Sequence, residues 1–391
     1  MEFQESEILQ ELPQQFFAKL VKNVNQKIAE GYDVINLGQG NSDQPTYQFI
    51  VDALIESVKN PLSHKYSQFR GNPNLKDAVT TFYKRKYGVE LDSEKEVSIL
   101  GGSKIGLVEL PLALMNPGDL LLLPDPGYPD YLSGTALAKI DYATVPLTIE
   151  NDFLPDLDAI PEETAKRAKF LYLNYPNNPT GAVATEEFYK EVVAFANKYQ
   201  VGIISDFAHG ALGADGYVSP SFLSIPGAKD VGVEFYTFSK TFNMAGWRLG
   251  FAVGNADMIE ALNLIQDHLF VSVFPAIQYA GVAALLDPQA EKEITRLNQI
   301  YDKRRHAFIE ASERIGWRGF TPKGAFYAWM PVAEGYTSES FAELLLEKTH
   351  VAVAPGNGFG KMGEGYVRIG LVIEPERLVE AVERIATLEL F

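Results

Sequence analysis

Two side chains of one short segment, residues 239–250, could do chemistry together. Lys240 comes just after a run typical of a buried strand, which ends at Phe238, and Arg248 comes eight residues later. A lysine held away from bulk water can lose its proton and form an imine with a carbonyl compound. The planar fork of donors on an arginine suits a phosphate group. An amine fixed beside a phosphate receptor is the arrangement that an enzyme using pyridoxal phosphate needs.

Short apolar runs alternate with helical patterns along the middle of the chain, at residues 120–123, 170–173, 201–204 and 234–238. Continuous apolarity of this kind is typical of strands buried on both faces of a parallel sheet, and the intervening helices indicate a doubly wound α/β domain. Ligands of such sheets bind at the carboxyl ends of the strands. One candidate side chain follows each run: Tyr128, Asn178, Asp206 and Lys240. We therefore expect these side chains to meet at one edge of the sheet.

The length of the chain favours two domains. With 391 residues it is too long for one simple core. A long charged helical pattern begins near residue 294, and a strand pattern at residues 366–371 and a closing amphipathic helix follow it. We expect a large domain over residues 46–290 and a smaller, discontinuous α+β domain built from residues 1–45 and 291–391.

Composition and charge exclude several classes of function. The formal net charge of −17 disfavours a role in gripping nucleic acid or an anionic membrane. The chain has no cysteine, which excludes disulfides, thiolate catalysis and cysteine-ligated metals, and no metal site is expected. The acidic N-terminal stretch lacks the blocks of a signal peptide, and no run of about 18 apolar residues offers a membrane span. We expect a soluble, cytoplasmic protein.

The segment SKTFNMAGWRLG at residues 239–250 resembles the lysine motif of the class I and II aminotransferases, which are pyridoxal phosphate (PLP) enzymes of fold type I. Other motifs of that family occur in its order from about Pro13 to Pro375, among them PDPGY, NNPTG and YVRIG. The resemblance implies the fold of that family, PLP as cofactor, and Lys240 as the residue that binds it covalently. It also implies ping-pong transamination, in which the amine of Lys240 moves a proton from the substrate Cα to the cofactor.

The resemblance places four residues around the cofactor phosphate. The stretch GGSKIG opens a helical pattern, and backbone N–H groups at a helix start form an anion site. In the family the equivalent backbone, here that of Ser103 and Lys104, cradles the phosphate, although the same residues would also suit a simple turn with an N-cap. Arg248 would pair with the phosphate charge. Thr237 stands where the family commonly has a serine that contacts the phosphate, and it retains a hydroxyl.

Four residues are expected around the cofactor ring. Tyr128 would stack on the pyridine face, and Asn178 would hydrogen-bond the phenolic oxygen. Asp206 would keep the ring nitrogen protonated so that the ring can withdraw electrons; capping of the next helix is a compatible alternative. His209 departs from the family, which mostly has a tyrosine that hydrogen-bonds the same oxygen. Either the histidine keeps that role as a different donor, or this position has been freed.

The resemblance also identifies residues that would contact the substrate and the second subunit. Arg368, in YVRIG, matches the arginine that binds the substrate α-carboxylate through its planar fork. Gly38 matches a glycine whose backbone lies against the substrate, where only glycine permits close approach, and Asn178 would border the substrate as well. Tyr66 corresponds to a tyrosine that reaches the phosphate of the neighbouring subunit, which implies a homodimer with shared active sites.

Residues 268–281 bear on the substrate side chain. This segment is largely apolar and holds no clear arginine for a distal carboxylate, which argues against an aspartate-type pocket and favours an apolar or thioether side chain. The chain is also similar to the methionine-salvage branch of the family, whose members convert 2-keto-4-methylthiobutyrate to methionine. It is similar as well to a neighbouring branch that acts on LL-diaminopimelate, and that alternative stays open.

Two other classes of protein share part of this pattern. A PLP-dependent C–S lyase has the same fold and most of the same residues, and it would release pyruvate and ammonia without a keto-acid acceptor. A regulatory protein that only binds PLP is disfavoured, because such members of the family carry a DNA-binding domain ahead of the PLP domain and this acidic chain has no room for one. An amino acid and a 2-keto acid are therefore the expected partners, with no nucleic acid and no membrane.

Overall fold

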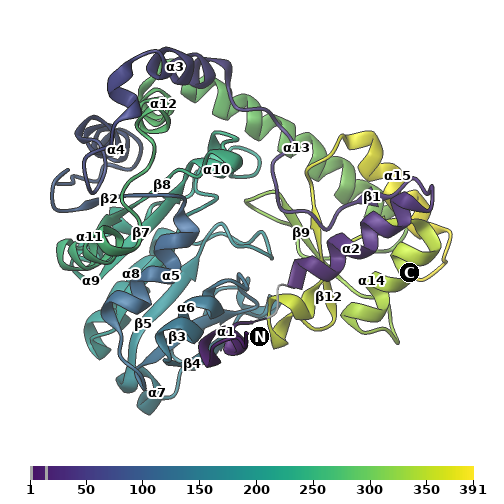
Figure 1. The fold of residues 1–391 in the computed structure, drawn as a ribbon. Helices are drawn as coiled ribbons and strands as arrows, with labels where there is room; N and C mark the ends of the chain where they lie inside the picture. The colour runs from purple at the N-terminus through teal and green to yellow at the C-terminus, as the bar shows by residue number, and fades with distance from the viewer. Residues whose placement is uncertain (1–2, 14–15) are drawn as a thin grey trace.

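The computed structural model describes residues 3–13 and 16–391, which form two lobes (Figure 1). Among these residues the larger lobe is built on a seven-stranded sheet, and the smaller lobe on a three-stranded sheet and a two-stranded one. The 25-residue helix α13 (Ala290–Arg314) runs from one lobe to the other. Within the described part of the chain, no helix is both long enough and apolar enough to cross a membrane.

The seven-stranded sheet is mostly parallel. Its strands follow the order β2 (Val97–Leu100), β8 (Gly250–Gly254), β7 (Gly232–Thr237), β6 (Gly202–Asp206), β5 (Ala168–Asn174), β3 (Leu120–Asp125) and β4 (Asp141–Pro146). The pairs that β8 makes with β2 and β7 are antiparallel, and the other pairs are parallel. This arrangement confirms the α/β fold class predicted from the sequence.

Helices cover both faces of this sheet. Alternate residues of one strand face opposite layers, so Leu171 and Leu173 of β5 pack in one hydrophobic cluster and Tyr172 packs in another. The first face is covered by α4 (Pro73–Tyr87), α8 (Glu186–Tyr199) and α12 (Pro275–Leu286), and the second by α5 (Ser103–Leu114), α6 (Tyr131–Ala138) and α11 (Ala256–Leu269). Burial on both sides explains why the strand runs are continuously apolar in the sequence.

The predicted strand runs correspond to β3, β5, β6 and β7, with two corrections: β6 begins at Gly202, one residue after the predicted start, and β7 ends before the predicted end. The run at residues 234–238 is predicted as strand throughout, but β7 ends at Thr237 and Phe238 begins the short helix α10 (Phe238–Thr241). The cause is local, because the Thr237 hydroxyl accepts a hydrogen bond from the Ser239 N–H at 3.1 Å and caps that helix. This cap turns the chain at the point where the strand reaches the edge of the sheet.

The smaller lobe joins residues from both ends of the chain. β1 (Ile35–Asn36) pairs in parallel with β10 (Val351–Ala352), and Ile35 shares a hydrophobic cluster with Trp317 and Leu378. The three-stranded antiparallel sheet has the order β11 (Ala354–Pro355), β12 (Tyr366–Gly370) and β9 (Tyr327–Pro331). The domain boundaries predicted from the sequence stay a prediction.

The other helices of the described residues are short or lie at the surface of a lobe. The α-helices are α1 (Glu7–Glu11), α2 (Phe16–Ala29), α3 (Gln48–Val58), α7 (Glu162–Arg167), α9 (Ala228–Val231), α14 (Ser338–Thr349) and α15 (Pro375–Ala386). The 3₁₀ helices are η1 (Pro61–His64), η2 (Ile149–Asn151), η3 (Phe222–Ser224), η4 (Ala245–Trp247), η5 (Gly356–Phe359) and η6 (Lys361–Gly363).

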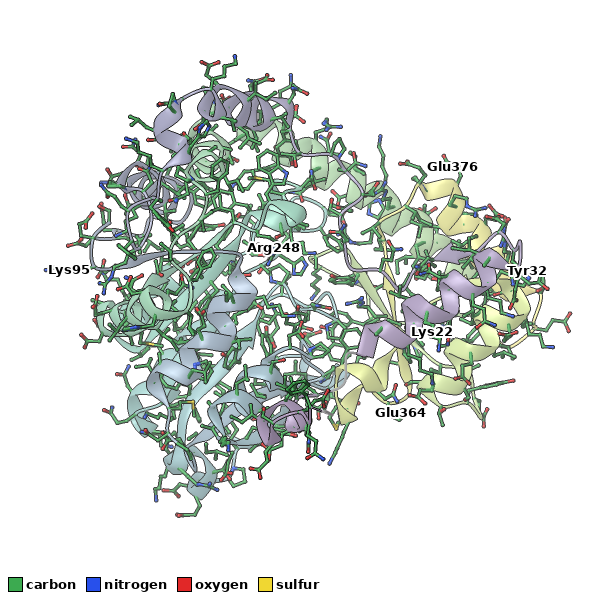
Figure 2. The ribbon with its side chains drawn as sticks, in the orientation of Figure 1. Lys22, Tyr32, Lys95, Arg248, Glu364 and Glu376 are labelled. Atoms are coloured by element: carbon green, nitrogen blue, oxygen red, sulfur yellow. The ribbon has the colours of Figure 1, made fainter. Side chains whose placement is uncertain are left out.

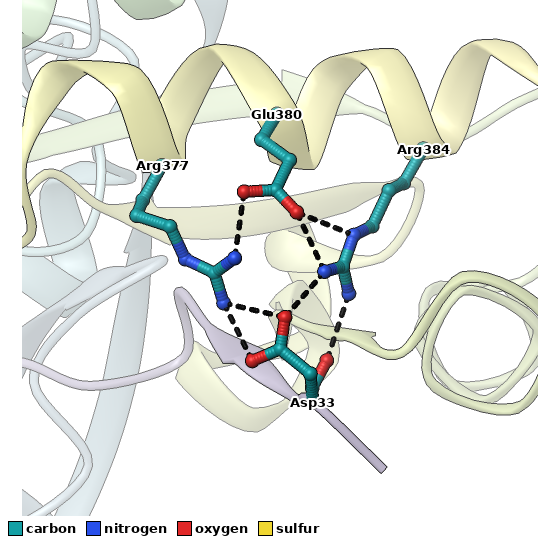
Figure 3. A network of polar contacts seen from close by, with 4 residues as sticks. All are labelled: Asp33, Arg377, Glu380 and Arg384. Carbon is teal, nitrogen blue, oxygen red and sulfur yellow. Dashed lines mark hydrogen bonds and ion pairs between the residues drawn. The ribbon is translucent and has the colours of Figure 1, made fainter.

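An ion-pair network fastens the chain at the entry to β1 to helix α15 (Figure 3). Both carboxylate oxygens of Asp33 accept hydrogen bonds from Arg377 Nη2, at 2.8 and 3.0 Å, and Asp33 Oδ2 also accepts one from Arg384 Nη2 at 2.6 Å. Glu380, on the same helix, accepts hydrogen bonds from both arginines. The network therefore holds the N-terminal segment against the C-terminal helix.

We expect the substitution Asp33→Asn to lower the thermal unfolding midpoint at low salt and to have little effect at high salt. Hydrogen bonds from Arg377 and Arg384 hold the pKa of Asp33 below its usual range. Its stabilising charge is thus present above the pKa of the unfolded chain, about 3.9, and is lost as the pH falls through the lower pKa of the folded protein. In about 1 M NaCl the Debye length shrinks to about 3 Å and the pairs are screened. Calorimetry of both proteins at the two salt concentrations measures the effect.

The control for this experiment is Glu56→Gln, which removes an isolated exposed pair with Lys59 on α3. An exposed pair of this kind contributes little, so the midpoint of that variant should match the wild type. An equal loss of stability in Asp33→Asn at both salt concentrations would show that the charges of the network are not its cause.

Candidate active site

A cavity of about 540 Å³ lies at the carboxyl ends of β5, β6 and β7, and the last residue of each of these strands lines it. Its opposite wall comes from the smaller lobe, and Arg248 lies between the two lobes in Figure 2. The cavity brings together all predicted site residues except Tyr66: Gly38, Ser103, Lys104, Tyr128, Asn178, Asp206, His209, Thr237, Lys240, Arg248 and Arg368. The predicted meeting of side chains at one edge of the sheet is therefore what the fold produces.

Lys240 reaches the cavity from the short helix that follows β7. Its Nζ donates a hydrogen bond to the carbonyl oxygen of Gly40 at 2.7 Å and lies 5.4 Å from the centre of the Phe326 ring. Burial lowers the pKa of Lys240 to about 8, and the positive charges of Arg368 and Arg248 act in the same direction. At pH 7 roughly a tenth of this amine is thus neutral, far more than for an ordinary lysine, and the neutral form is the one that acts as a nucleophile or a general base.

The Gly40 carbonyl is held in place by contacts of the residues that follow it. Ser42 Oγ donates a hydrogen bond to Asn243 Oδ1 at 2.5 Å, which ties the segment to the loop after Lys240. Arg304 of α13 binds both carboxylate oxygens of Asp43, at 2.8 and 2.7 Å. The N-terminal segment is therefore fastened to the lysine loop and to the long helix close to the acceptor for Lys240.

Asp206, the last residue of β6, is a buried carboxylate that faces the cavity. Its Oδ2 accepts a hydrogen bond from the Tyr131 hydroxyl at 2.6 Å, and its Oδ1 accepts one from the Ala208 N–H at 3.2 Å. Burial raises the pKa of Asp206 to about 6, and the two hydrogen bonds oppose that shift. A buried carboxylate in this position is stabilised by a cationic partner, such as the protonated ring nitrogen of PLP.

Arg368 of β12 forms the opposite end of the cavity and is buried. Its Nη1 donates a hydrogen bond to Asn178 Oδ1 at 2.8 Å, and its Nη2 donates one to the Gly38 carbonyl at 3.1 Å. The guanidinium carbon lies 4.4 Å from the centre of the Tyr327 ring and 4.7 Å from that of the Phe359 ring. Two aromatic rings and two oxygen acceptors therefore fix the plane of the guanidinium group, which a planar carboxylate could then meet with both oxygens.

The start of α5 and the side chain of Arg248 meet at another part of the cavity wall. Gly102 has a φ of +98°, and a Cβ atom there would overlap the guanidinium group of Arg248. The first N–H groups of an α-helix have no intrahelical acceptor, and Ser103 is the first residue of this one. The Lys104 side chain instead pairs with Asp130 at 2.8 Å, so its contribution to an anion site would come from its backbone, as predicted. A helix start beside a guanidinium group suits a phosphate.

Thr237 and Tyr128 line the cavity, but neither is bonded to another predicted site residue by its polar atom. The Thr237 hydroxyl donates to Ser239 Oγ at 2.9 Å while it caps α10. The Tyr128 ring lies edge-on to Tyr131, with the ring centres 5.5 Å apart. Their predicted contacts with the phosphate and the pyridine ring stay predictions.

His209 is buried at the cavity wall, and among the described residues neither of its ring nitrogens has a hydrogen-bond partner. Its ring packs edge-on against Phe326 and Tyr327. Burial, with Lys240 and Arg368 nearby, holds the pKa of His209 well below its usual range, so the imidazole is neutral. An unpaired buried polar group is costly, and a bound group with a hydrogen-bonding oxygen would remove that cost.

Several residues that shape the site do not stand out in the sequence. Tyr131 follows Tyr128 by three positions, yet nothing in the sequence pairs it with Asp206. Asn174 accepts a hydrogen bond from the Asn178 N–H at 2.8 Å, and this contact orients the NNPTG turn. Tyr327 places its ring against Arg368, a contact that no sequence pattern indicates. The described donors, acceptors and charges thus fit PLP: an amine, an anion site, a buried carboxylate and an unpaired imidazole share one cavity.

Tyr66 lies outside the cavity and is 91% exposed. Leu62 and Phe69, on either side of it in the sequence, are 66% and 61% exposed. Large apolar side chains that are exposed together often mark an interface between proteins. The predicted role of Tyr66 in a neighbouring subunit stays a prediction.

Comparisons with known proteins agree with this site. The family model "Aminotransferase class I and II" matches residues 32–385. The chain is 57% identical over 391 residues to the L-glutamine–4-(methylsulfanyl)-2-oxobutanoate aminotransferase of Bacillus subtilis, covering 100% of this chain and 98% of the relative. It is 47% identical over 382 residues to the LL-diaminopimelate aminotransferase of Moorella thermoacetica, covering 98% and 97%. The substrate-bound structure of BacF from Bacillus subtilis superimposes with a TM-score of 0.94 at 46% identity, covering 100% of this chain and 98% of that one.

We expect the rate at which PLP attaches covalently to the apoprotein to rise with pH through a midpoint near 8. This midpoint follows from the pKa of Lys240, which burial and the nearby arginines lower to about 8. The visible absorbance of the bound cofactor after rapid mixing measures the rate. Lys240→Arg is the control and should show no such absorbance, because a guanidinium group does not lose its proton in this range. A midpoint near 10.5, the ordinary value for lysine, would contradict the expectation.

Proposed function

This chain belongs to the class I and II aminotransferases, and we propose that it transfers the amino group of glutamine to 4-(methylsulfanyl)-2-oxobutanoate (2-keto-4-methylthiobutyrate), forming methionine. The chain is a PLP-dependent transaminase. The name of the Bacillus subtilis relative supplies both substrates of the proposal. A cytoplasmic location, predicted from the sequence, stays a prediction.

The observation that carries the substrate proposal is the apolar part of the cavity wall. Leu20 and Val21 of α2 line the cavity, and Leu20 packs so closely on Gly38 that an added Cβ would lie 2.5 Å from its Cδ2. An apolar or thioether side chain fits such a wall, whereas a second charged group would be desolvated there without a partner.

The cations of the described cavity wall already have other roles. Arg368 lies at the proposed carboxylate end, Lys240 is the reacting amine, and Arg248 lies at the phosphate end. The Lys104 side chain is paired with Asp130. No lysine or arginine of the described lining is therefore left for a distal carboxylate, which supports a substrate with an uncharged side chain.

The residues of this chain divide the work of the reaction between them. Arg368 binds the α-carboxylate, which amino acids and keto acids share, and so orients both substrates of a ping-pong cycle in one way. Lys240 Nζ takes the proton from the substrate Cα. Asp206 holds a proton at the ring nitrogen of the cofactor. PLP, when bound, supplies the electron sink that stabilises negative charge at that carbon.

Asn178 and His209 face the same cavity from neighbouring strand ends. The Asn178 carbonyl oxygen accepts a hydrogen bond from Arg368, so its amide N–H groups are the donors left for a cofactor oxygen. His209, neutral and unpaired among the described residues, would provide a second donor to that oxygen. We propose that His209 keeps the role that a tyrosine has in most of the family.

A panel of amino donors and keto-acid acceptors tests the proposed substrates. We expect the highest kcat/KM for glutamine with 4-(methylsulfanyl)-2-oxobutanoate, and no transamination by Lys240→Ala, which removes the amine but should retain the fold seen by circular dichroism. A preference for LL-diaminopimelate with 2-oxoglutarate would contradict the substrate proposal. Release of pyruvate and ammonia without an acceptor would favour a C–S lyase.

We also propose a homodimer with shared active sites, formed through an exposed apolar patch. The patch is defined by Leu62, Tyr66, Phe69, Leu269, Phe270, Val271 and Phe274. Its two segments meet at Gln278, whose Nε2 donates hydrogen bonds to Ser67 Oγ at 3.1 Å and to the Val273 carbonyl at 2.7 Å. A Cβ on Gly101 would lie 3.7 Å from the Phe270 ring, so the patch borders the phosphate end of the site. A second copy seated here would bring its own Tyr66 near that end.

We expect Phe69→Asp to shift the protein toward a monomer and to weaken cofactor binding. Tyr66→Phe should stay dimeric. It should bind PLP about tenfold more weakly, because it loses one hydrogen bond to a charged group. Sedimentation velocity and cofactor titration measure the two effects. Tyr142→Asp is the matched control, because Tyr142 is an exposed aromatic residue on the edge strand β4, outside the patch. Tight cofactor binding by a monomeric variant would contradict the shared site.

A further inference from the structure

Asp125 is a buried carboxylate at the end of β3 that has no part in the reaction described above. It is 3% exposed, and its Oδ1 accepts a hydrogen bond from the Met362 N–H at 2.9 Å. Burial raises the pKa of Asp125, and the backbone N–H groups of Met362 and Lys361 oppose that shift. Both donors belong to η6 in the smaller lobe, so the end of a strand in the larger sheet is bonded directly to a turn of the other lobe.

A second hydrogen bond joins the same two pieces of chain. The Gly127 N–H donates to the Phe359 carbonyl at 2.7 Å. Between Phe359 and η6, Gly360 has a φ of +131°, and a Cβ atom on it would overlap the carboxylate of Asp125. The turn therefore needs glycine both for its backbone conformation and for its close approach to the carboxylate.

Both partners of this contact carry residues of the active site. Phe359 presents its ring to the guanidinium group of Arg368, with the ring centre 4.7 Å from the guanidinium carbon. On the other side, Tyr128 directly follows Gly127 and lines the cavity. The Asp125 contact thus links one of the two rings close to Arg368 to the wall where the cofactor ring is expected.

We propose that Asp125 is a positioning residue, which holds the turn at residues 359–362 so that Phe359 keeps the guanidinium plane of Arg368 aimed at the substrate carboxylate. The inference rests on the proposed role of Arg368. It predicts that Asp125 affects substrate affinity without touching the substrate or the cofactor.

A carboxylate suits this position better than an amide of the same shape. The Met362 N–H donates to Asp125, the Lys361 N–H also favours the ionised form against the effect of burial, and an ionised carboxyl group only accepts hydrogen bonds. In Asp125→Asn, one oxygen could still accept, but the NH₂ group would face the other N–H. One donor of the turn would then be unpaired, and the turn would be free to move with Phe359.

The test compares Asp125→Asn with the wild-type holoenzyme. We expect KM for both the amino acid and the keto acid to rise about tenfold, with kcat changed by less than about twofold, as for the loss of one charge-assisted hydrogen bond that orients a binding group. The dissociation constant of PLP and the thermal midpoint should match the wild type. The substrates are whichever donor and acceptor the panel identifies.

The matched control is Asp119→Asn, at the residue directly before β3 and so beyond its opposite end. Asp119 likewise accepts a hydrogen bond from a backbone N–H, that of Asn116 at 2.8 Å, and it pairs with Lys169 outside the cavity. Its substitution should leave both KM values unchanged. Gly360→Ala, which displaces the turn from the other side, should reproduce the rise in KM.

Arg368→Gln separates a failure of this inference from a failure of the proposed site. If KM is unchanged in Arg368→Gln, the carboxylate-binding role of Arg368 is wrong. If KM rises in Arg368→Gln but not in Asp125→Asn, the positioning role of Asp125 is overturned. It is overturned as well if Asp125→Asn weakens PLP binding and lowers the thermal midpoint in proportion to KM, because a general structural defect would do that.

Discussion

The site depends on lowering the pKa of one amine in a cavity that also holds guanidinium groups. Lys240, Arg248 and Arg368 line the same space, and like charges at short range in a medium of low polarity repel strongly. Burial and this repulsion together lower the pKa of Lys240 to about 8. The same two effects hold His209 neutral. Positive potential thus serves both to bind anions and to free the nucleophile.

Each of the remaining charges is compensated by a specific arrangement. Arg368 lies close to two aromatic rings and donates to Asn178 and Gly38, which offsets the cost of burying it. Asp206 is held by Tyr131 and by a backbone N–H, but two neutral donors do not cancel the effect of burial on its pKa. The carboxylate therefore favours a cation beside it, and a protonated ring nitrogen would be one.

The two lobes contribute different parts of this arrangement, so the contacts between them matter for function. The larger sheet supplies the lysine, the aspartate and the anion site at its strand ends, while the smaller lobe supplies the arginine. Gly40, from the N-terminal segment, supplies the acceptor for Lys240. Asp125 joins the larger lobe to the smaller one, and Arg304 joins the long helix α13 to the N-terminal segment. Each does so through a buried charge whose partner lies far away in the sequence.

The sequence by itself determined the fold class and most of the site. Strands buried on two faces are continuously apolar and can be recognised in the sequence, and the carboxyl ends of parallel strands meet at one edge of the sheet. Because Asn178, Asp206 and Lys240 each follow such a run, the sequence is enough to predict that they lie together. Only the tertiary structure decided that Tyr131 binds Asp206, that the Lys104 side chain turns away to Asp130, and that His209 is unpaired among the described residues. These contacts join residues whose separation in the chain carries no periodic signal, and burial, which sets the pKa values, is a property of the packed fold.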